Sequence, residues 1–180
     1  INTSANSGNT SLSFREAFGK YDTRYTAPKT PWFISQPFGS TEYNLFHFES
    51  IDDGAYANDK FKISIAGLKA SADPRNDFGT FTVVVRDFND TDLNPVILEQ
   101  WSNVSLNPNA ENYIAKVIGD KKVSYIVDVE DENDRKLQIS GKYPLKSKFV
   151  RVVMNSSITD GVVFITMILV SLAVKITALT

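Results

Sequence analysis

The chain has 180 residues, enough for one domain or slightly more with a proper hydrophobic core, and its composition excludes disorder along most of its length. A formal net charge of −2 argues against a nucleic-acid-binding protein, which needs a basic face to neutralise phosphates. The absence of Cys excludes disulfides, thiolate nucleophiles and sulfur-ligated metals.

The first forty residues carry no periodic pattern. Residues 1–13 are rich in Asn, Ser and Thr and predict an exposed loop. In residues 14–39 aromatic side chains alternate with Gly and three Pro, which exclude a long helix, so we expect irregular chain anchored by buried rings. Because the sequence begins at Ile1 without a leader pattern, we expect it to be an excerpt of a longer chain.

Two segments between residues 43 and 65 have the period of a β-strand. Residues 43–48 alternate well enough to place His47 on one face and Phe46 and Phe48 on the other. Residues 61–65 alternate strictly between apolar and polar side chains, which predicts a strand with one buried face.

The segment 78–88 gives the strongest strand signal in the chain, with three consecutive valines at positions 83–85. A run as apolar as this predicts burial on both faces of the strand. A polar turn follows it, and residues 96–101 predict another short strand.

One segment carries the signals of a helix. Asn107 can cap its N-terminus, Pro108 suits the first helical position, and Gly119 suits the C-terminal cap. Between these signals lies an apolar stripe that can pack on a sheet, formed by Tyr113, Ile114, Val117 and Ile118.

Three more predicted strands complete the pattern. Residues 123–129 and 137–139 flank a charged turn and predict a hairpin, and residues 149–154 predict the last strand. The sequence therefore predicts an α+β fold, mainly antiparallel β-sheet with one clear helix packed on a face. We expect a sheet-rich body domain at residues 1–157 and an apolar C-terminal segment at residues 158–180.

The apolar segment is open to two interpretations. Residues 162–174 contain no charged residue, and a membrane helix needs about 20 apolar residues. A membrane-anchored β-rich domain with residues 162–180 as its anchor is therefore the alternative function. The content of Val, Ile and Thr also suits a pair of buried strands, and Asp160 precedes the run where an anchor favours Lys or Arg.

The residues predict no catalytic, cofactor or metal site. His47 is the one histidine and has no partner in the sequence pattern, so a packed or surface histidine is favoured. Asp87, Asp90 and Asp92 suggest a calcium loop, but the EF-hand spacing and its closing Glu are missing, which favours a solvated turn. We expect a protein that is not an enzyme.

Eleven short segments, in order along residues 20–155, carry a resemblance. The longest is 77–86 (DFGTFTVVVR), and the others are 30–33, 45–48, 52–54, 89–92, 95–99, 103–109, 113–114, 118–120, 141–144 and 147–152. Together they resemble tail sheath proteins of the large bacteriophages with contractile tails. The chain departs from that pattern after about Asn155.

The resemblance implies a mechanical role in the virion. Sheath subunits of this family stack as hexameric rings around a tail tube and contract during genome delivery, without hydrolysing a nucleotide. Identical subunits and the tail tube protein would be the partners, with no cofactor, nucleic acid or membrane. The expected location is the phage tail, after assembly in the cytoplasm of the bacterial host.

With this resemblance, two charged turns become candidate subunit-contact loops, because polar contacts at the rim of an interface set its specificity. Solvated loops without a partner are the alternative interpretation. The candidate residues are Asn89, Asp90 and Asp92 in the first turn, and Glu130, Asp131, Glu132 and Asp134 in the second.

Overall fold

The computed structural model divides the chain into two units. One contains Ile1–Thr26 and Lys122–Ser140, and the other contains Ala27–Lys121 and Gly141–Thr180. The structure describes residues 26–35, 42–73, 75–76, 78–127, 129 and 131–159, together with the backbone of residues 3–4, 11–12 and 173–175.

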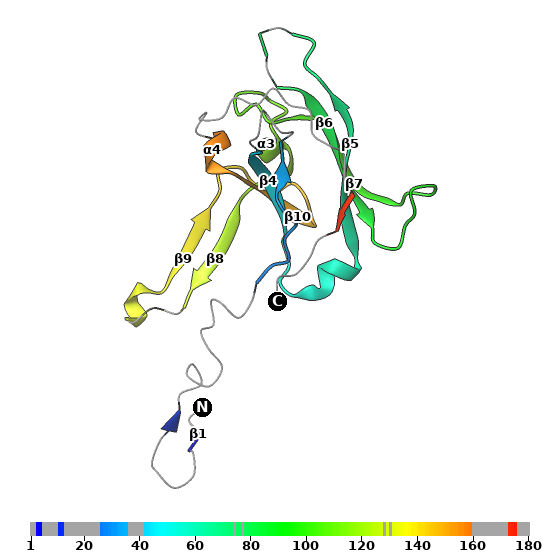
Figure 1. The fold of residues 1–180 in the computed structure, drawn as a ribbon. Helices are drawn as coiled ribbons and strands as arrows, with labels where there is room; N and C mark the ends of the chain where they lie inside the picture. The colour runs from blue at the N-terminus through cyan, green and yellow to red at the C-terminus, as the bar shows by residue number, and fades with distance from the viewer. Residues whose placement is uncertain are drawn as a thin grey trace. The chain divides into compact units, whose positions relative to one another are not determined.

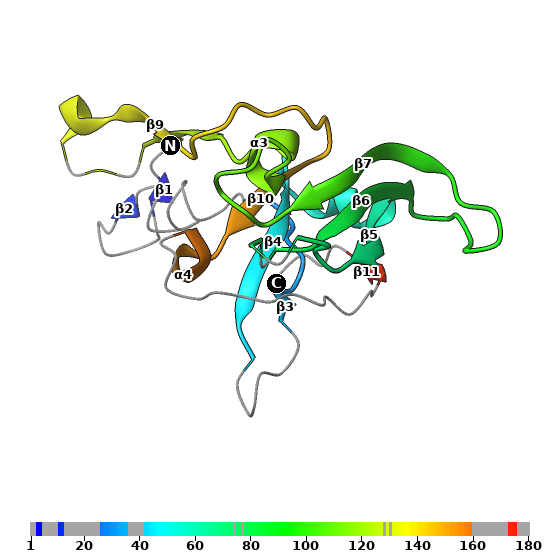
Figure 2. The ribbon, with the colours of Figure 1, turned by 90° about the horizontal axis from the view of Figure 1, so that it is seen from above.

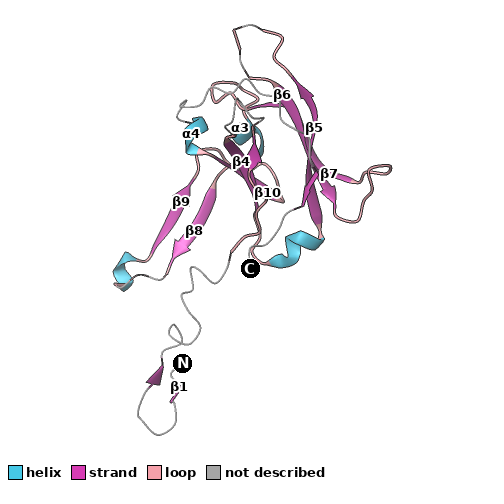
Figure 3. Ribbon diagram, viewed as in Figure 1, coloured by secondary structure: helices cyan, strands magenta, loops and turns pink. Residues whose placement is uncertain are grey.

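The larger unit contains two antiparallel sheets (Figure 1). The first has the strand order β10-β4-β3 and consists of β3 (Phe33–Ile34), β4 (Asn44–Ser50) and β10 (Val150–Met154). The second has the order β11-β5-β6-β7 and consists of β5 (Phe61–Lys69), β6 (Thr80–Asp87), β7 (Ile97–Ser105) and β11 (Ala173–Lys175). Strands dominate the described residues (Figure 3), so the prediction of a mainly antiparallel β-sheet protein is confirmed.

The two clearest sequence patterns correspond to β5 and β6. In β5, Phe61, Ile63 and Ile65 are buried and the residues between them are partly exposed, as strict alternation predicts. In β6 the three valines 83–85 are all buried, so the prediction of burial on both faces is also confirmed. In the pairing register, Ile63 lies opposite Val85.

A cluster of aromatic rings joins the two sheets of the larger unit. The ring of Phe46 on β4 stacks on Phe33 with centroids 4.9 Å apart and on Phe81 of β6 with centroids 6.0 Å apart. Phe48 meets both Phe33 and Phe46 edge to face. These rings belong to one hydrophobic core that both sheets share. Leu45 and His47, predicted on the other face of β4, are buried as well.

The predicted helix is much shorter than its sequence signals suggest, and its predicted start is wrong. Helix α3 spans Ile114–Ile118 and lies against β10 and β7 (Figure 2). Asn107 does not cap it but forms a turn, in which its side chain accepts a hydrogen bond from the backbone N–H of Asn109. Tyr113 is extended because it forms a parallel bridge with Ser105, and extended backbone cannot belong to a helix.

The C-terminal end of α3 and its apolar stripe agree with the prediction. Gly119 follows the helix with a φ of 104°, and its N–H donates to the carbonyl of Ala115. Tyr113, Ile114 and Ile118 are buried. Two further short elements, η1 (Ala55–Asp59) and α4 (Ser156–Thr159), were not predicted.

The smaller unit contains the predicted hairpin. Strands β8 (Lys122–Ile126) and β9 (Lys136–Ser140) pair antiparallel and are joined by the 3₁₀ turn η2 (Glu132–Asp134). A second pair, β1 (Thr3–Ser4) and β2 (Ser11–Leu12), lies within the predicted N-terminal loop.

Several predictions concern residues outside the described ones. These are the rest of residues 1–25, residues 36–41 and most of the apolar segment, of which residues 158–159 and the backbone of β11 are described. The boundary at residue 157 therefore stays a prediction. No helix among the described residues is long and apolar enough to cross a membrane.

Candidate functional site

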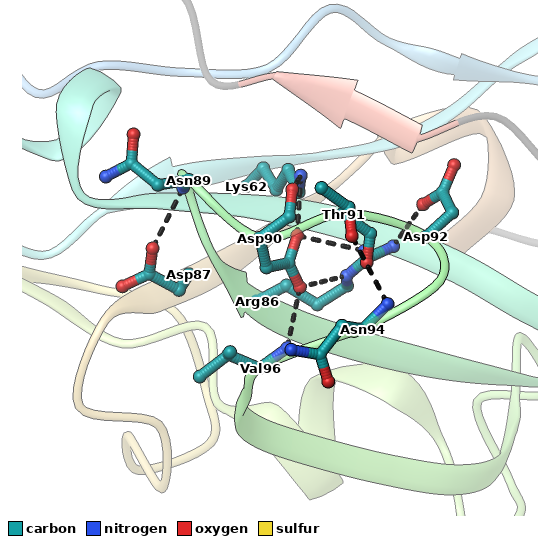
Figure 4. A network of polar contacts seen from close by, with 9 residues as sticks. All are labelled: Lys62, Arg86, Asp87, Asn89, Asp90, Thr91, Asp92, Asn94 and Val96. Carbon is teal, nitrogen blue, oxygen red and sulfur yellow. Dashed lines mark hydrogen bonds and ion pairs between the residues drawn. The ribbon is translucent and has the colours of Figure 1, made fainter.

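The first candidate loop is the turn between β6 and β7, and a polar network holds its shape (Figure 4). The side chain of Asp90 points back toward the strands and is inaccessible to solvent. Its two carboxylate oxygens accept hydrogen bonds from the Arg86 guanidinium at 2.7 and 2.9 Å. Lys62 on β5 lies 2.6 Å from the same carboxylate, and the backbone N–H of Val96 donates to it at 2.8 Å.

The network offsets the repulsion between two cationic side chains in the sheet. Lys62 and Arg86 lie directly opposite each other in the register of β5 and β6, and like charges in that position repel. The Asp90 carboxylate lies between them and is attracted to both. Asp90 therefore balances the charge of these two cations, and its side chain faces the strands behind the turn.

The network also shifts the ionisation of its members. Hydrogen bonds from Arg86, followed by those from Lys62 and the Val96 backbone, hold the pKa of Asp90 well below its ordinary value of 3.8, although desolvation opposes this. The pKa of Arg86 is raised in turn, by its hydrogen bonds to Asp90 and then to Asp92. Asp90 therefore stabilises the folded chain in its ionised form.

We expect the substitution Asp90→Asn to lower the melting temperature at pH 7, with the difference from the wild type shrinking in acid. The folded-state pKa is depressed, so the stabilisation is complete above the unfolded value near 3.8 and is lost as the pH falls below it. Thermal unfolding followed by circular dichroism between pH 7 and pH about 2 measures the difference.

Asp92→Asn is the matched control for this substitution. Asp92 accepts one hydrogen bond from Arg86 at 2.9 Å, but its side chain is 88% exposed, so water screens the pair. We expect a smaller effect at pH 7 than for Asp90→Asn. Equal effects of the two substitutions, or a difference that grows in acid, would contradict the role assigned to Asp90.

The remaining candidates of the first loop are exposed. The backbone N–H of Asn89 donates to the Asp87 side chain at 2.8 Å (Figure 4), and both Asn89 and Asp92 are exposed. Leu93, which follows Asp92 in the sequence, is 100% exposed. Residues 91 and 94–96 are exposed as well, so the turn presents both polar and apolar side chains to the surroundings.

The second candidate loop is the tip of the β8–β9 hairpin. The Asp131 side chain caps η2 by accepting a hydrogen bond from the backbone N–H of Asn133 at 2.9 Å. Glu132 pairs with Arg135 at 3.0 Å, and Asp134 is exposed. Glu130 lies outside the described residues.

The described residues show no group of carboxylates arranged to bind a metal ion. Both oxygens of Asp90 face cationic side chains, and Asp87 accepts the Asn89 backbone N–H. Among the described residues, no cluster of three or more His, Asp or Glu side chains suits a metal ion.

His47 is a packed residue on β4. Its ring meets Trp32 edge to face with centroids 4.3 Å apart, and its Nε2 lies 3.3 Å from a carboxylate oxygen of Glu49. Arg151 of β10 pairs with the other Glu49 oxygen. Burial, together with the charges of Lys29 and Arg151, lowers the pKa of His47, so the neutral ring is favoured.

Sequence reasoning placed the acidic turn but missed the two cations behind it. Lys62 lies 28 positions before Asp90 in the chain, and its contact depends on the β5–β6 register. The signal available in the sequence was one cationic residue, Lys62 or Arg86, in each of two consecutive predicted strands.

No protein-family model, curated protein or solved structure matches the chain.

Proposed function

We propose that this chain is a structural, non-enzymatic subunit of a bacteriophage contractile tail sheath, with an α+β body in which α3 packs on sheet. The observation that carries the proposal is the ordered set of resembling segments along residues 20–155. Identical subunits and the tail tube protein are the proposed partners, and the phage tail is the proposed location.

The position of the resembling segments supports this proposal. The segments 77–86 and 147–152 supply Val83, Val85, Val150 and Val152, which are all fully buried. Core positions decide which backbone a sequence can adopt. The resemblance thus involves residues that determine the fold, in addition to those in surface turns.

The exposed members of the two charged turns are the proposed subunit contacts. In the first turn these are Asn89 and Asp92, and in the second Asp131, Glu132 and Asp134. The turns are fixed in shape by the Asp90 network and by the Asp131 cap. A preformed polar surface lowers the entropy lost on association, which suits a subunit that repacks its contacts during contraction.

Electron microscopy tests the proposal directly. The full-length protein is expressed without any partner, purified and imaged in negative stain. We expect striated tubes or stacked rings, because sheath subunits assemble with copies of themselves. A parallel preparation from cells that carry an empty vector controls for host filaments of similar width.

Two results would contradict the proposal. The first is a protein that stays monomeric at every concentration and salt condition at which it remains folded. The second is a protein recovered only from the detergent-extracted membrane fraction, which would support the membrane-anchored alternative and its anchor at residues 162–180.

A further inference from the structure

The loop that follows the β8–β9 hairpin is basic. Residues 141–149 carry three lysines and no acidic residue, so their formal charge is +3. Lys142, Lys146 and Lys148 are all exposed. None of the ion pairs found among the described residues includes these three lysines, so their ammonium groups are available to an acidic partner.

The acidic side chains that contact this loop hold its backbone. Asp120 accepts hydrogen bonds from the backbone N–H groups of residues 142–143 at 2.9 and 2.6 Å. Glu99 on β7 accepts one from the Ser147 hydroxyl at 2.6 Å and one from the Lys148 backbone N–H at 3.0 Å. The two carboxylates reduce the local charge from +3 to +1, and they give the loop a fixed shape, which lowers the entropy lost on association.

The closed end of the hairpin carries the opposite charge. Residues 128–136 contain five acidic residues against two cations, Arg135 and Lys136, which gives a net charge of −3. Arg135 is paired with Glu132 at 3.0 Å, but the Glu132 side chain remains 79% exposed. Asp134 is exposed as well. The closed end is therefore acidic even when both of its cations are counted.

The hairpin separates these two charged regions along one chain. Its strands pair from Lys122 and Ser140 at the open end to Ile126 and Lys136 toward the closed end, a length of about 13 Å at 3.3 Å per residue. The basic loop continues from the open end, whereas the acidic residues lie at the closed end. A second copy of the chain is the partner that the opposite charges favour.

We propose that the acidic closed end of the β8–β9 hairpin docks on the basic loop 141–149 of a neighbouring copy of this chain. This inference rests on the proposed function, because it names the partner of the second candidate loop. The contact joins two different surfaces and is therefore heterologous, and heterologous contacts repeat from copy to copy until they close a ring or continue as a helix. It thus agrees with stacked rings and tubes. Each exposed ion pair is weak, and repetition of the contact makes the assembly strong.

Sedimentation velocity of the 180-residue chain over a range of protein and salt concentrations tests the contact. We expect reversible association that weakens as salt is added, because salt screens exposed charges. Glu132→Lys with Asp134→Lys reverses the hairpin charge and keeps the Asp131 cap of η2. Lys142→Glu with Lys146→Glu reverses the loop charge. Each variant should associate about ten-fold more weakly, because several pairs change from attraction to repulsion.

A mixture of the two variants tests whether these two surfaces pair with each other. Each variant alone brings like charges together, whereas alternating copies in the mixture bring opposite charges together at every contact. The mixture should therefore associate nearly as well as the wild type, and so should a chain with all four substitutions.

Asp52→Lys with Asp53→Lys is the matched control. It changes the net charge of the chain as much as the hairpin variant does, at two exposed positions outside both surfaces. We expect association to change by less than about two-fold. Circular dichroism of every variant confirms that the fold is retained, and the salt dependence of the wild type tests the contact without any substitution.

The outcomes separate this inference from the proposed function. A wild-type chain that stays monomeric at low salt, or whose association does not depend on salt, overturns the inference. A mixture that associates no better than either variant overturns it too, as does weakening by the loop variant alone, which would indicate a different acidic partner. Tubes or rings that form equally well from both variants overturn the contact, while the sheath function stands. Association that responds as expected in a protein that never forms tubes or rings supports the contact and contradicts the function.

Discussion

Replacing Phe46 by alanine should lower the free energy of unfolding by about 3–5 kcal/mol, the usual cost of removing a buried aromatic ring. Phe46 is fully buried and stacks on Phe33 and on Phe81, so its ring contacts both sheets of the larger unit. The cavity left behind cannot close without moving one sheet relative to the other. Unfolding in urea, with linear extrapolation to water, measures the change.

Tyr56→Ala is the control for this substitution. The Tyr56 ring is 66% exposed and contacts the Lys60 ammonium group, so its removal should cost less than about 1 kcal/mol. If the two substitutions had equal effects, the shared core of the two sheets would be wrong. A fall in the slope of the urea transition would indicate that the sheets no longer unfold together.

Local patterns in the sequence were sufficient to predict the longer strands, but not the two-residue strands β1, β2 and β3, which lie in segments predicted as a loop and as irregular chain. Alternation at residues 61–65 and the valines at 83–85 each determine a burial pattern within a few neighbouring residues. The hairpin at 122–140 follows in the same way from two short strands around a charged turn. Period and turn chemistry act locally, and a single sequence displays them.

Pairing between distant segments could not be predicted in that way. Strand β10 pairs with β4 so that Val152 lies opposite Phe48, across about a hundred positions of chain. The prediction of where α3 starts was wrong for the same reason. Asn107 and Pro108 are good helix signals, but the pairing of Ser105 with Tyr113 holds the chain extended up to the residue before the helix.

In the candidate site too, local sequence features were predicted and contacts between distant residues were not. The acidic composition of residues 89–92 was visible in the sequence, and it suggested side chains that face solvent or a neighbour. Asp90 instead turns inward, because the sheet register brings Lys62 and Arg86 together and their repulsion needs a carboxylate. Which acidic residue of a turn is structural depends on charges that only the folded sheet brings close.

Replacing Gly119 by alanine should destabilise the chain by about 2–6 kcal/mol, because two separate costs add. The first is backbone strain, since the φ of 104° is one that residues with a Cβ rarely adopt. The second is a steric clash: a Cβ here would lie 2.5 Å from both the Leu145 Cα and the Pro144 carbonyl oxygen. Both contacts are with backbone, which cannot rotate away as a side chain can.

Gly54→Ala separates the two costs. Gly54 also has a positive φ, 80°, but a Cβ there would meet nothing within 4 Å, so this substitution carries the strain alone, about 1–3 kcal/mol. The excess for Gly119→Ala in urea unfolding then measures how tightly the end of α3 docks on the chain at Leu145. That docking also includes hydrogen bonds from the Lys146 and Ser147 N–H groups to the Ile118 carbonyl, at 2.9 and 3.2 Å. Equal costs at the two glycines would mean that the loop at Leu145 yields to the added methyl group.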